Sequence, residues 1–257
     1  YTTIGGWMLA YFVKMVKGDF TGLDTEGVSA AFGSLSTDMT QMIFWMVLIV
    51  VIGFAVCSMG LQKGVEKITK IMMVVLLALM VFLAVRSCTL EGASEGLKFY
   101  LLPDFGKLSE YKIQEVIFAA MGQAFFTLSL GIGALAIFGS YIGKEHKLTG
   151  EAVSITILDT MVALIAGLII FPACSAFNVN PGEGPGLVFV TLPNVFNAMK
   201  GGRFWGALFF LFMSFAALST IIAVFQNIIS FAQDLWNWSV KKAALSRYFA
   251  IFLLSLP

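Results

Sequence analysis

The fold of this chain is decided by a stretch near its middle, Gly122-Gln-Ala-Phe-Phe-Thr-Leu-Ser-Leu-Gly-Ile-Gly-Ala134. Two hydroxyl side chains and three glycines lie here within one apolar segment, which has no charged residue from position 116 to 143. Glycine lowers the cost of leaving helical dihedral angles, and hydroxyl groups can bind a ligand beside the freed backbone groups. The stretch indicates either a membrane helix that is broken near 127–133, or a helix whose small residues let neighbouring helices approach closely.

The composition of the whole chain is that of a membrane protein. Hydrophobic residues make up 59% of the 257 residues and charged residues only 12%, whereas a soluble domain has about 25% charged residues. The apolar runs are long and continuous and lack the alternation of barrel strands, so we expect an all-α polytopic membrane protein. The seven predicted spans are 1–16, 40–62, 66–86, 114–142, 152–176, 204–232 and 244–257.

Both ends of the chain fall within apolar segments. The chain starts at Tyr1 without an initiator Met, and its last segment has about ten residues where a span needs about twenty. We therefore expect the sequence to be truncated at both ends.

The distribution of positive charge predicts an orientation. The 16 Lys and Arg residues divide equally between alternate connections, but one set is concentrated in short loops, where the positive-inside effect operates. We therefore predict a multi-pass protein of the cell membrane with cytoplasmic loops near 63–70, 143–151 and 234–243. The long apolar connection 178–200 would then lie outside, where it either folds back onto the protein as a re-entrant loop or lies at the membrane interface.

Several classes of function are excluded by what the sequence lacks. The net charge of +1 and the absence of a basic stripe argue against nucleic-acid binding. No metal-binding cluster, nucleophile motif or phosphate loop occurs, so we expect no enzyme. A retinal protein would need a Lys in the interior of a span, and Lys14, Lys67 and Lys70 lie only near the ends of theirs. An unrelated membrane-embedded receptor remains an alternative.

Asp159 is the only ionisable residue deep within any of the apolar segments. An unpaired carboxylate at this depth costs several kcal/mol, so it requires a cation, and the other spans offer no Lys or Arg in their interiors. Asp159 therefore indicates a bound ion or proton, or else a neutral carboxyl group that is hydrogen-bonded to a neighbouring hydroxyl.

Two adjacent hydroxyls, Ser219 and Thr220, occur in the apolar run Phe215-Ala-Ala-Leu-Ser-Thr220. Hydroxyl and carbonyl oxygens are the ligands that a hard cation prefers. Hydroxyls in membrane helices also commonly donate to carbonyls of their own helix. Both interpretations are open from the spacing alone.

The stretches 122–131 and 215–220, together with the opening Tyr1-Thr-Thr-Ile-Gly-Gly-Trp7, resemble the neurotransmitter:sodium symporter family, especially its bacterial amino-acid transporters. The similarity extends over the whole chain. It implies one partial transporter domain over 1–257, equivalent to transmembrane helices three to nine, in an inverted-repeat fold for which the family is a standard example. It also implies that residues 187–199 are the helical extracellular loop four.

The resemblance also implies roles for individual residues, with two Na⁺ sites that a first helix beyond this chain would complete. The implied substrate-binding residues are Tyr1, Phe126, Thr127, Ser129, Gly131, Ile132, Thr220 and Val224, and the implied gate residues are Gln123 and Phe126. The implied sodium ligands are Thr127 and Asp159 in the first site, and Ala216, Ser219 and Thr220 in the second.

The chain departs from the family pattern at Asp159, where asparagine is common, and at Ala163, which offers neither the acid nor the hydroxyl found in other members. We expect Asp159 to supply the negative charge itself, so that chloride is not required. The pocket wall formed by Phe126, Ile132 and Val224 is apolar. The expected function is sodium-coupled symport of a neutral hydrophobic or aromatic amino acid by alternating access across the lipid bilayer. A non-transporting or regulatory relative is the alternative, and the oligomeric state is open.

Overall fold

The computed structural model describes residues 2–58, 62–102, 113–130, 133, 139, 147–181 and 184–236. In these ranges the chain forms helices, turns and loops but no strand, so the predicted all-α fold is confirmed. The helices are α1 (Thr2–Lys17), α2 (Thr25–Thr37), α3 (Met39–Ser58), α4 (Gln62–Cys88), α5 (Ala93–Leu101), α7 (Ile113–Thr127), α9 (Leu148–Phe177), the π-helix η2 (Leu187–Thr191), α10 (Leu192–Asn197) and α11 (Gly202–Trp236).

Among the described residues, three helices are long and apolar enough to cross a membrane on their own: Lys70–Cys88 within α4, the whole of α9, and Gly202–Phe225 within α11. The pair formed by α2 and α3 meets the same criterion together, but it is bent by 77° at its break. The seven spans stay predictions, and the last of them, 244–257, lies outside the described residues.

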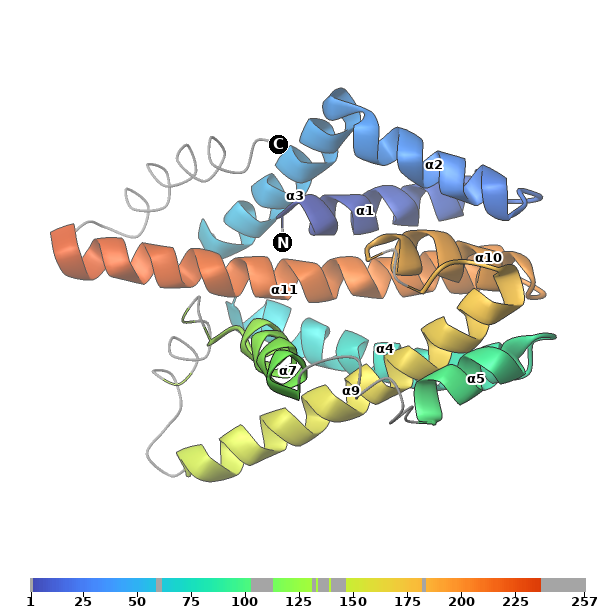
Figure 1. Ribbon diagram of the computed structural model, residues 1–257. Coiled ribbons are helices and arrows are strands. Elements are labelled where there is room, and N and C mark those ends of the chain that lie inside the picture. Colours follow the sequence, from blue (N-terminus) through green and yellow to red (C-terminus); the bar gives the residue numbers. More distant parts are fainter. Residues whose placement is uncertain are drawn as a thin grey trace.

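The helices pack around α11, which runs through the middle of the molecule (Figure 1). On one side of it lie α1 and α3, which also contact each other, and on the other side lies α4. Helix α9 packs against α4 and is covered in turn by the short helix α5. This arrangement brings helices from opposite ends of the sequence, α1 and α11, into extensive contact.

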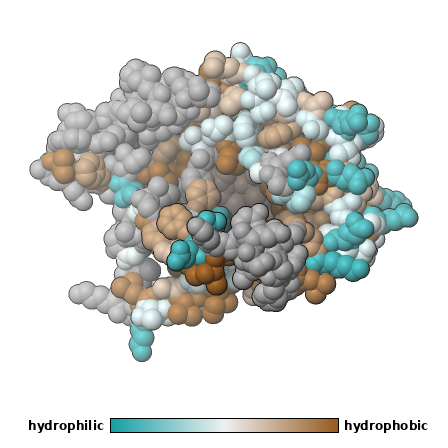
Figure 2. Space-filling view, viewed as in Figure 1, coloured by the Kyte–Doolittle hydropathy of each residue, from teal (hydrophilic) through white to brown (hydrophobic). Residues whose placement is uncertain are grey.

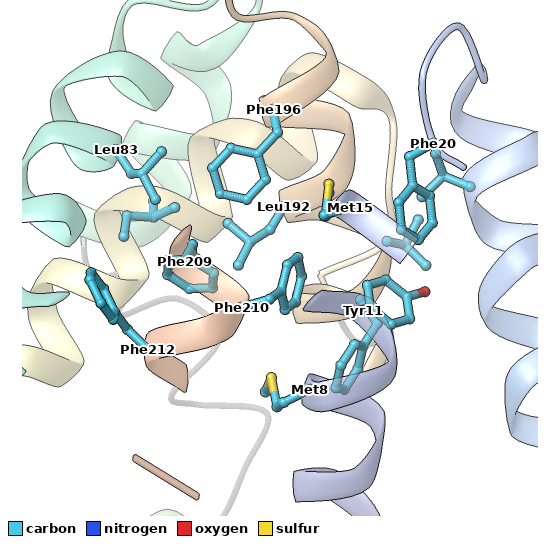
Figure 3. Close-up of a cluster of buried hydrophobic side chains, with 14 of the residues drawn as sticks. Met8, Tyr11, Met15, Phe20, Leu83, Leu192, Phe196, Phe209, Phe210 and Phe212 are labelled. Carbon is cyan, nitrogen blue, oxygen red and sulfur yellow. The ribbon is translucent and has the colours of Figure 1, made fainter. Parts of the chain in front are cut away.

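A buried apolar core joins α1, α4, α9, η2, α10 and α11. Tyr11 lies at its centre, with its ring centroid 4.9 Å from that of Phe189, 5.0 Å from that of Phe20 and 5.1 Å from that of Phe210. Figure 3 shows the rings of Tyr11, Phe20 and Phe210 together with the flanking methionine and leucine side chains. The connection 178–200 thus contributes η2 and α10 to the core, and its side chains Phe189, Val190, Leu192 and Phe196 are buried.

Hydrophilic side chains gather at the end of the molecule where α2, α5 and α10 lie, at the right of the space-filling view (Figure 2). All three of these elements lie in connections between the predicted spans. Helix α2 begins at a local signal in the sequence, because the Asp24 side chain accepts a hydrogen bond of 2.8 Å from the backbone N–H of Gly27.

One loop boundary is corrected by the structure. Residues 63–70, which we predicted as a cytoplasmic loop, form the first turns of α4. Lysine and glutamate are favourable in helices, so the charged residues there mark the end of the apolar segment without ending the helix.

Helix α9 is held by α5 through two close approaches. A Cβ atom on Gly96 of α5 would collide with the carbonyl group of Phe171, and one on Gly167 of α9 would collide with the ring of Tyr100. The Tyr100 ring stacks on that of Phe171 at a centroid distance of 4.9 Å, and its hydroxyl donates to the Leu164 carbonyl at 3.2 Å. Only glycine permits these approaches, and they fix the half of α9 that follows Asp159.

Candidate functional site

The predicted break in the middle of the chain is present. Helix α7 ends at Thr127, and the next turn is tightened by a hydrogen bond from the Ser129 N–H to the Phe126 carbonyl. Ser129 has a left-handed φ of 52°, which is unusual for a residue with a side chain, and Gly133 has a φ of 67°. The helix therefore stops within the stretch where the glycines and hydroxyls are concentrated.

The end of α7 meets the intramembrane carboxylate of α9. The Thr127 hydroxyl lies 3.1 Å from Oδ1 and 3.2 Å from Oδ2 of Asp159, so it donates a hydrogen bond that the two carboxylate oxygens share. Thr127 is exposed and Asp159 is half-buried in the described part of the chain. The break thus brings a hydroxyl and a carboxylate together from positions 32 residues apart.

These oxygen atoms have the chemistry of a site for a hard monovalent or divalent cation. No group of three or more His, Cys, Asp or Glu side chains that could hold a metal ion occurs in the described ranges. A cation here would need carbonyl or hydroxyl oxygens from other segments, which suits a weakly held ion better than a structural metal.

A second cluster of oxygen atoms lies on α11. The Ser219 hydroxyl donates to the Ala216 carbonyl at 2.8 Å, and the Thr220 hydroxyl donates to the same carbonyl at 3.3 Å. All three residues are half-buried. In this geometry the hydroxyls bond back to their own helix, which is one of the two interpretations left open by the sequence. The same arrangement places two hydroxyls, which could rotate toward an ion, next to one backbone carbonyl oxygen.

Of the remaining predicted site residues, three lie in the described ranges and three lie outside them. Gln123 and Phe126 are exposed on α7, and Val224 is half-buried on α11 one turn after Thr220. Tyr1, Gly131 and Ile132 lie outside the described residues.

One residue next to the break, Asn227, was not predicted from the sequence. A Cβ atom on Gly133 would lie 3.1 Å from Nδ2 of Asn227, so this side chain of α11 lies directly against the chain that follows the break. The available signal was a polar amide in the charge-free segment 204–232, close to Val224.

The family follows from comparison with known proteins. A family model described as the sodium:neurotransmitter symporter family matches residues 25–256. The chain belongs to this family. The resemblance noted from the sequence is thereby confirmed, and the apolar helices are those of a membrane-integral symporter-family protein.

The symporter-family relatives extend over the whole chain. An uncharacterized sodium-dependent transporter, YhdH, of Bacillus subtilis (strain 168) is 36% identical over 257 residues, which are 100% of this chain and 56% of the relative. Sodium-dependent nutrient amino acid transporter 1 of Drosophila grimshawi is 30% identical over 96% of this chain and 38% of its own length. The chain thus spans about half the length of the bacterial relative, and both names describe transporters and no enzyme.

A solved structure shares the fold. The crystal structure of MhsT in complex with L-phenylalanine matches with a TM-score of 0.92 and 40% sequence identity, covering 100% of this chain and 58% of MhsT. The predicted transporter fold is therefore confirmed for this chain.

Proposed function

We propose that the protein to which this chain belongs is a sodium-coupled symporter of a neutral hydrophobic or aromatic amino acid that works by alternating access. The observation that carries the proposal is the contact between Thr127, at the end of a broken helix, and Asp159, the carboxylate within an apolar helix. The L-phenylalanine bound to MhsT supports the substrate class, since the two folds agree closely.

In this proposal Thr127 and Asp159 bind one sodium ion, and Ala216, Ser219 and Thr220 bind a second. Sodium is a hard cation that prefers hydroxyl, carbonyl and carboxylate oxygens, which are the groups these residues offer. The substrate would lie beside the break, against Ser129, Gly131, Ile132 and the α11 residues Thr220 and Val224, together with Tyr1. Gln123 and Phe126 would close the pocket from outside.

The test is uptake of radiolabelled L-phenylalanine by the full-length protein in proteoliposomes, with an inward sodium gradient or an equal potassium gradient. We expect accumulation with the sodium gradient only. Uptake that is independent of sodium would refute the coupling. Binding of the amino acid without uptake would instead identify a non-transporting relative of the same fold.

We further propose that the transporter does not need chloride. Asp159 brings a negative charge next to the first ion, and Ala163, one turn later, has no group that could bind an anion. Sodium-driven uptake should be unchanged when chloride is replaced by gluconate, and Asp159→Asn should abolish it. Strong chloride dependence of the wild-type protein would contradict this assignment.

We also propose an orientation in the plasma membrane in which α2, α5 and α10 face outward. The loops near 143–151 and 234–243, and the start of α4, would face the cytoplasm. In a variant without reactive native cysteines, Lys98→Cys should react with a membrane-impermeant maleimide added to intact cells, and Lys147→Cys should react only after permeabilisation. Both side chains are exposed, so the opposite labelling pattern would invert the orientation.

A further inference from the structure

Asn227 is a polar amide on an apolar membrane helix. Residues 204–233 contain no charged side chain, and Asn227 is half-buried among the described residues. A polar group within a membrane helix is costly unless it is paired, and such residues commonly have a functional role.

Asn227 continues the face of α11 that contains the candidate site. Ala216, Thr220, Val224 and Asn227 follow one another at intervals of four, four and three residues. Residues at this spacing lie one above the other along a helix. The amide is therefore one turn beyond the proposed substrate-binding wall.

The partner on the other side is Gly133, which lies beyond the break in the chain that follows α7. With a φ of 67°, Gly133 adopts a conformation that residues with a side chain rarely take. A Cβ atom added to it would lie 3.1 Å from Nδ2 and 4.0 Å from Cγ of Asn227. A methyl group at position 133 would therefore be in tight contact with the amide, which would have to shift by a few tenths of an ångström to admit it.

We propose that Asn227 is a positioning residue that fixes the backbone at Gly133 relative to α11. One half of the candidate site is Thr127 with Asp159, which meet at the break. The other half, on α11, is Ala216, Ser219 and Thr220. A contact between Gly133, beyond the break, and Asn227, on α11, joins these two halves. An amide offers two donors and one acceptor and is suited to the backbone groups of non-helical chain. The proposal rests on the proposed function, since it assigns Asn227 to the binding of sodium and substrate at that site.

A double-mutant cycle on the full-length protein tests the contact. The variants are Gly133→Ala, Asn227→Ala and the double variant, and the measured quantity is sodium-dependent binding of radiolabelled L-phenylalanine in detergent. We expect Gly133→Ala alone to weaken binding by about tenfold or more, and clearly less in the Asn227→Ala background, where the amide no longer blocks the added methyl group. Strictly additive effects would overturn the proposal.

A second measurement separates positioning from general stability. The melting temperature of each variant is compared with and without sodium. A positioning residue should reduce the sodium-induced rise in melting temperature, whereas a merely structural one should lower both values equally, and that result would also overturn the proposal. Gly150→Ala is the matched control, because no atom lies within 4 Å of a Cβ atom there among the described residues. If Gly133→Ala does not fold, Asn227→Ala alone still distinguishes a smaller sodium-induced rise in melting temperature from an equal lowering of both melting temperatures.

The two proposals can fail separately. If the wild-type protein does not bind L-phenylalanine with sodium present, the proposed function fails. Non-additive melting temperatures in the same cycle, measured without any ligand, would then still support the contact between Asn227 and Gly133.

Discussion

A carboxylate within an apolar helix is stable only if its charge is compensated. Asp159 is half-buried and accepts a hydrogen bond from Thr127, but one hydroxyl group does not neutralise a full negative charge. In the proposed function a sodium ion compensates this charge, and the Thr127 hydroxyl orients the carboxylate and adds an oxygen ligand.

The Thr127 hydroxyl should be essential to the first ion. In Thr127→Val the side chain keeps its shape but loses the oxygen atom, so we expect the sodium concentration for half-maximal binding of L-phenylalanine to rise by about tenfold or more, since hydrogen bonds to charged groups contribute about 1.5–3 kcal/mol. Thr127→Ser retains the oxygen and should bind sodium nearly normally. Equal sodium affinity in the valine and serine variants would contradict the role of the hydroxyl.

At the scale of single elements, the starts of α2 and α3 are marked by short local signals. Asp38 precedes α3, and its carboxylate accepts hydrogen bonds from the backbone N–H groups of Thr40 at 2.9 Å and Gln41 at 3.2 Å. The Gln41 amide also donates to Asp38 at 2.9 Å. The backbone and side-chain hydrogen bonds from Gln41, followed by the one from Thr40, hold the pKa of Asp38 below its ordinary value.

The cap of α3 should make stability depend on pH. Because the folded-state pKa of Asp38 is lowered, its contribution is present above the unfolded-state pKa of about 3.9 and is lost as the pH falls through the lower folded-state value. Asp38→Ala should therefore have a lower melting temperature than the wild-type protein at pH 7, and the difference should shrink below about pH 4. Asp38→Asn, which keeps an acceptor oxygen but has no charge, is the control. A gap between wild type and Asp38→Ala that is constant with pH would show that the charge plays no part.

The close contact between α5 and α9 should contribute to the stability of the protein. Gly96→Ala should destabilise the protein by about 1–3 kcal/mol, because the new methyl group meets the backbone at Phe171, which cannot move aside as a side chain could. Gly33→Ala in α2, where nothing lies within 4 Å among the described residues, is the matched control and should be neutral or slightly stabilising. Thermal unfolding in detergent measures both. Equal melting temperatures would show that α5 is not held closely to α9.

At the scale of the whole molecule, the candidate site is divided between helices that come from distant parts of the chain. Asp159 lies on α9 and the hydroxyl pair lies on α11. Helix α7 contacts Asp159 through Thr127, and Gly133, beyond the end of α7, lies against Asn227 of α11. Ligands that bind such a divided site stabilise the same arrangement of helices, which couples their affinities.

Sodium and the amino acid should therefore stabilise the full-length protein cooperatively. The melting temperature should rise more with both present than the sum of the two separate rises, because each ligand binds more tightly to the arrangement that the other favours. Potassium in place of sodium is the control. Purely additive rises would argue against a shared site.

The sequence by itself determined the helical membrane architecture, the break near 127–133, the place of Asp159 within an apolar helix and the resemblance to the family. These features are local or compositional: apolar length, glycine and hydroxyl content, and a single charge in an apolar segment are properties of neighbouring residues. The helices α2 and α5, in contrast, lie in connections that we did not predict as helical. Of these, α2 has a recognisable signal in the cap at Asp24.

Only the tertiary structure decided which distant residues meet. Tyr100 packs against Gly167, and Asn227 lies against Gly133, although more than sixty residues separate the partners of each pair. Nothing in a local pattern shows that a glycine is needed because of a side chain on another helix. Such contacts depend on which helices become neighbours, and that is set by the packing of the whole chain around α11.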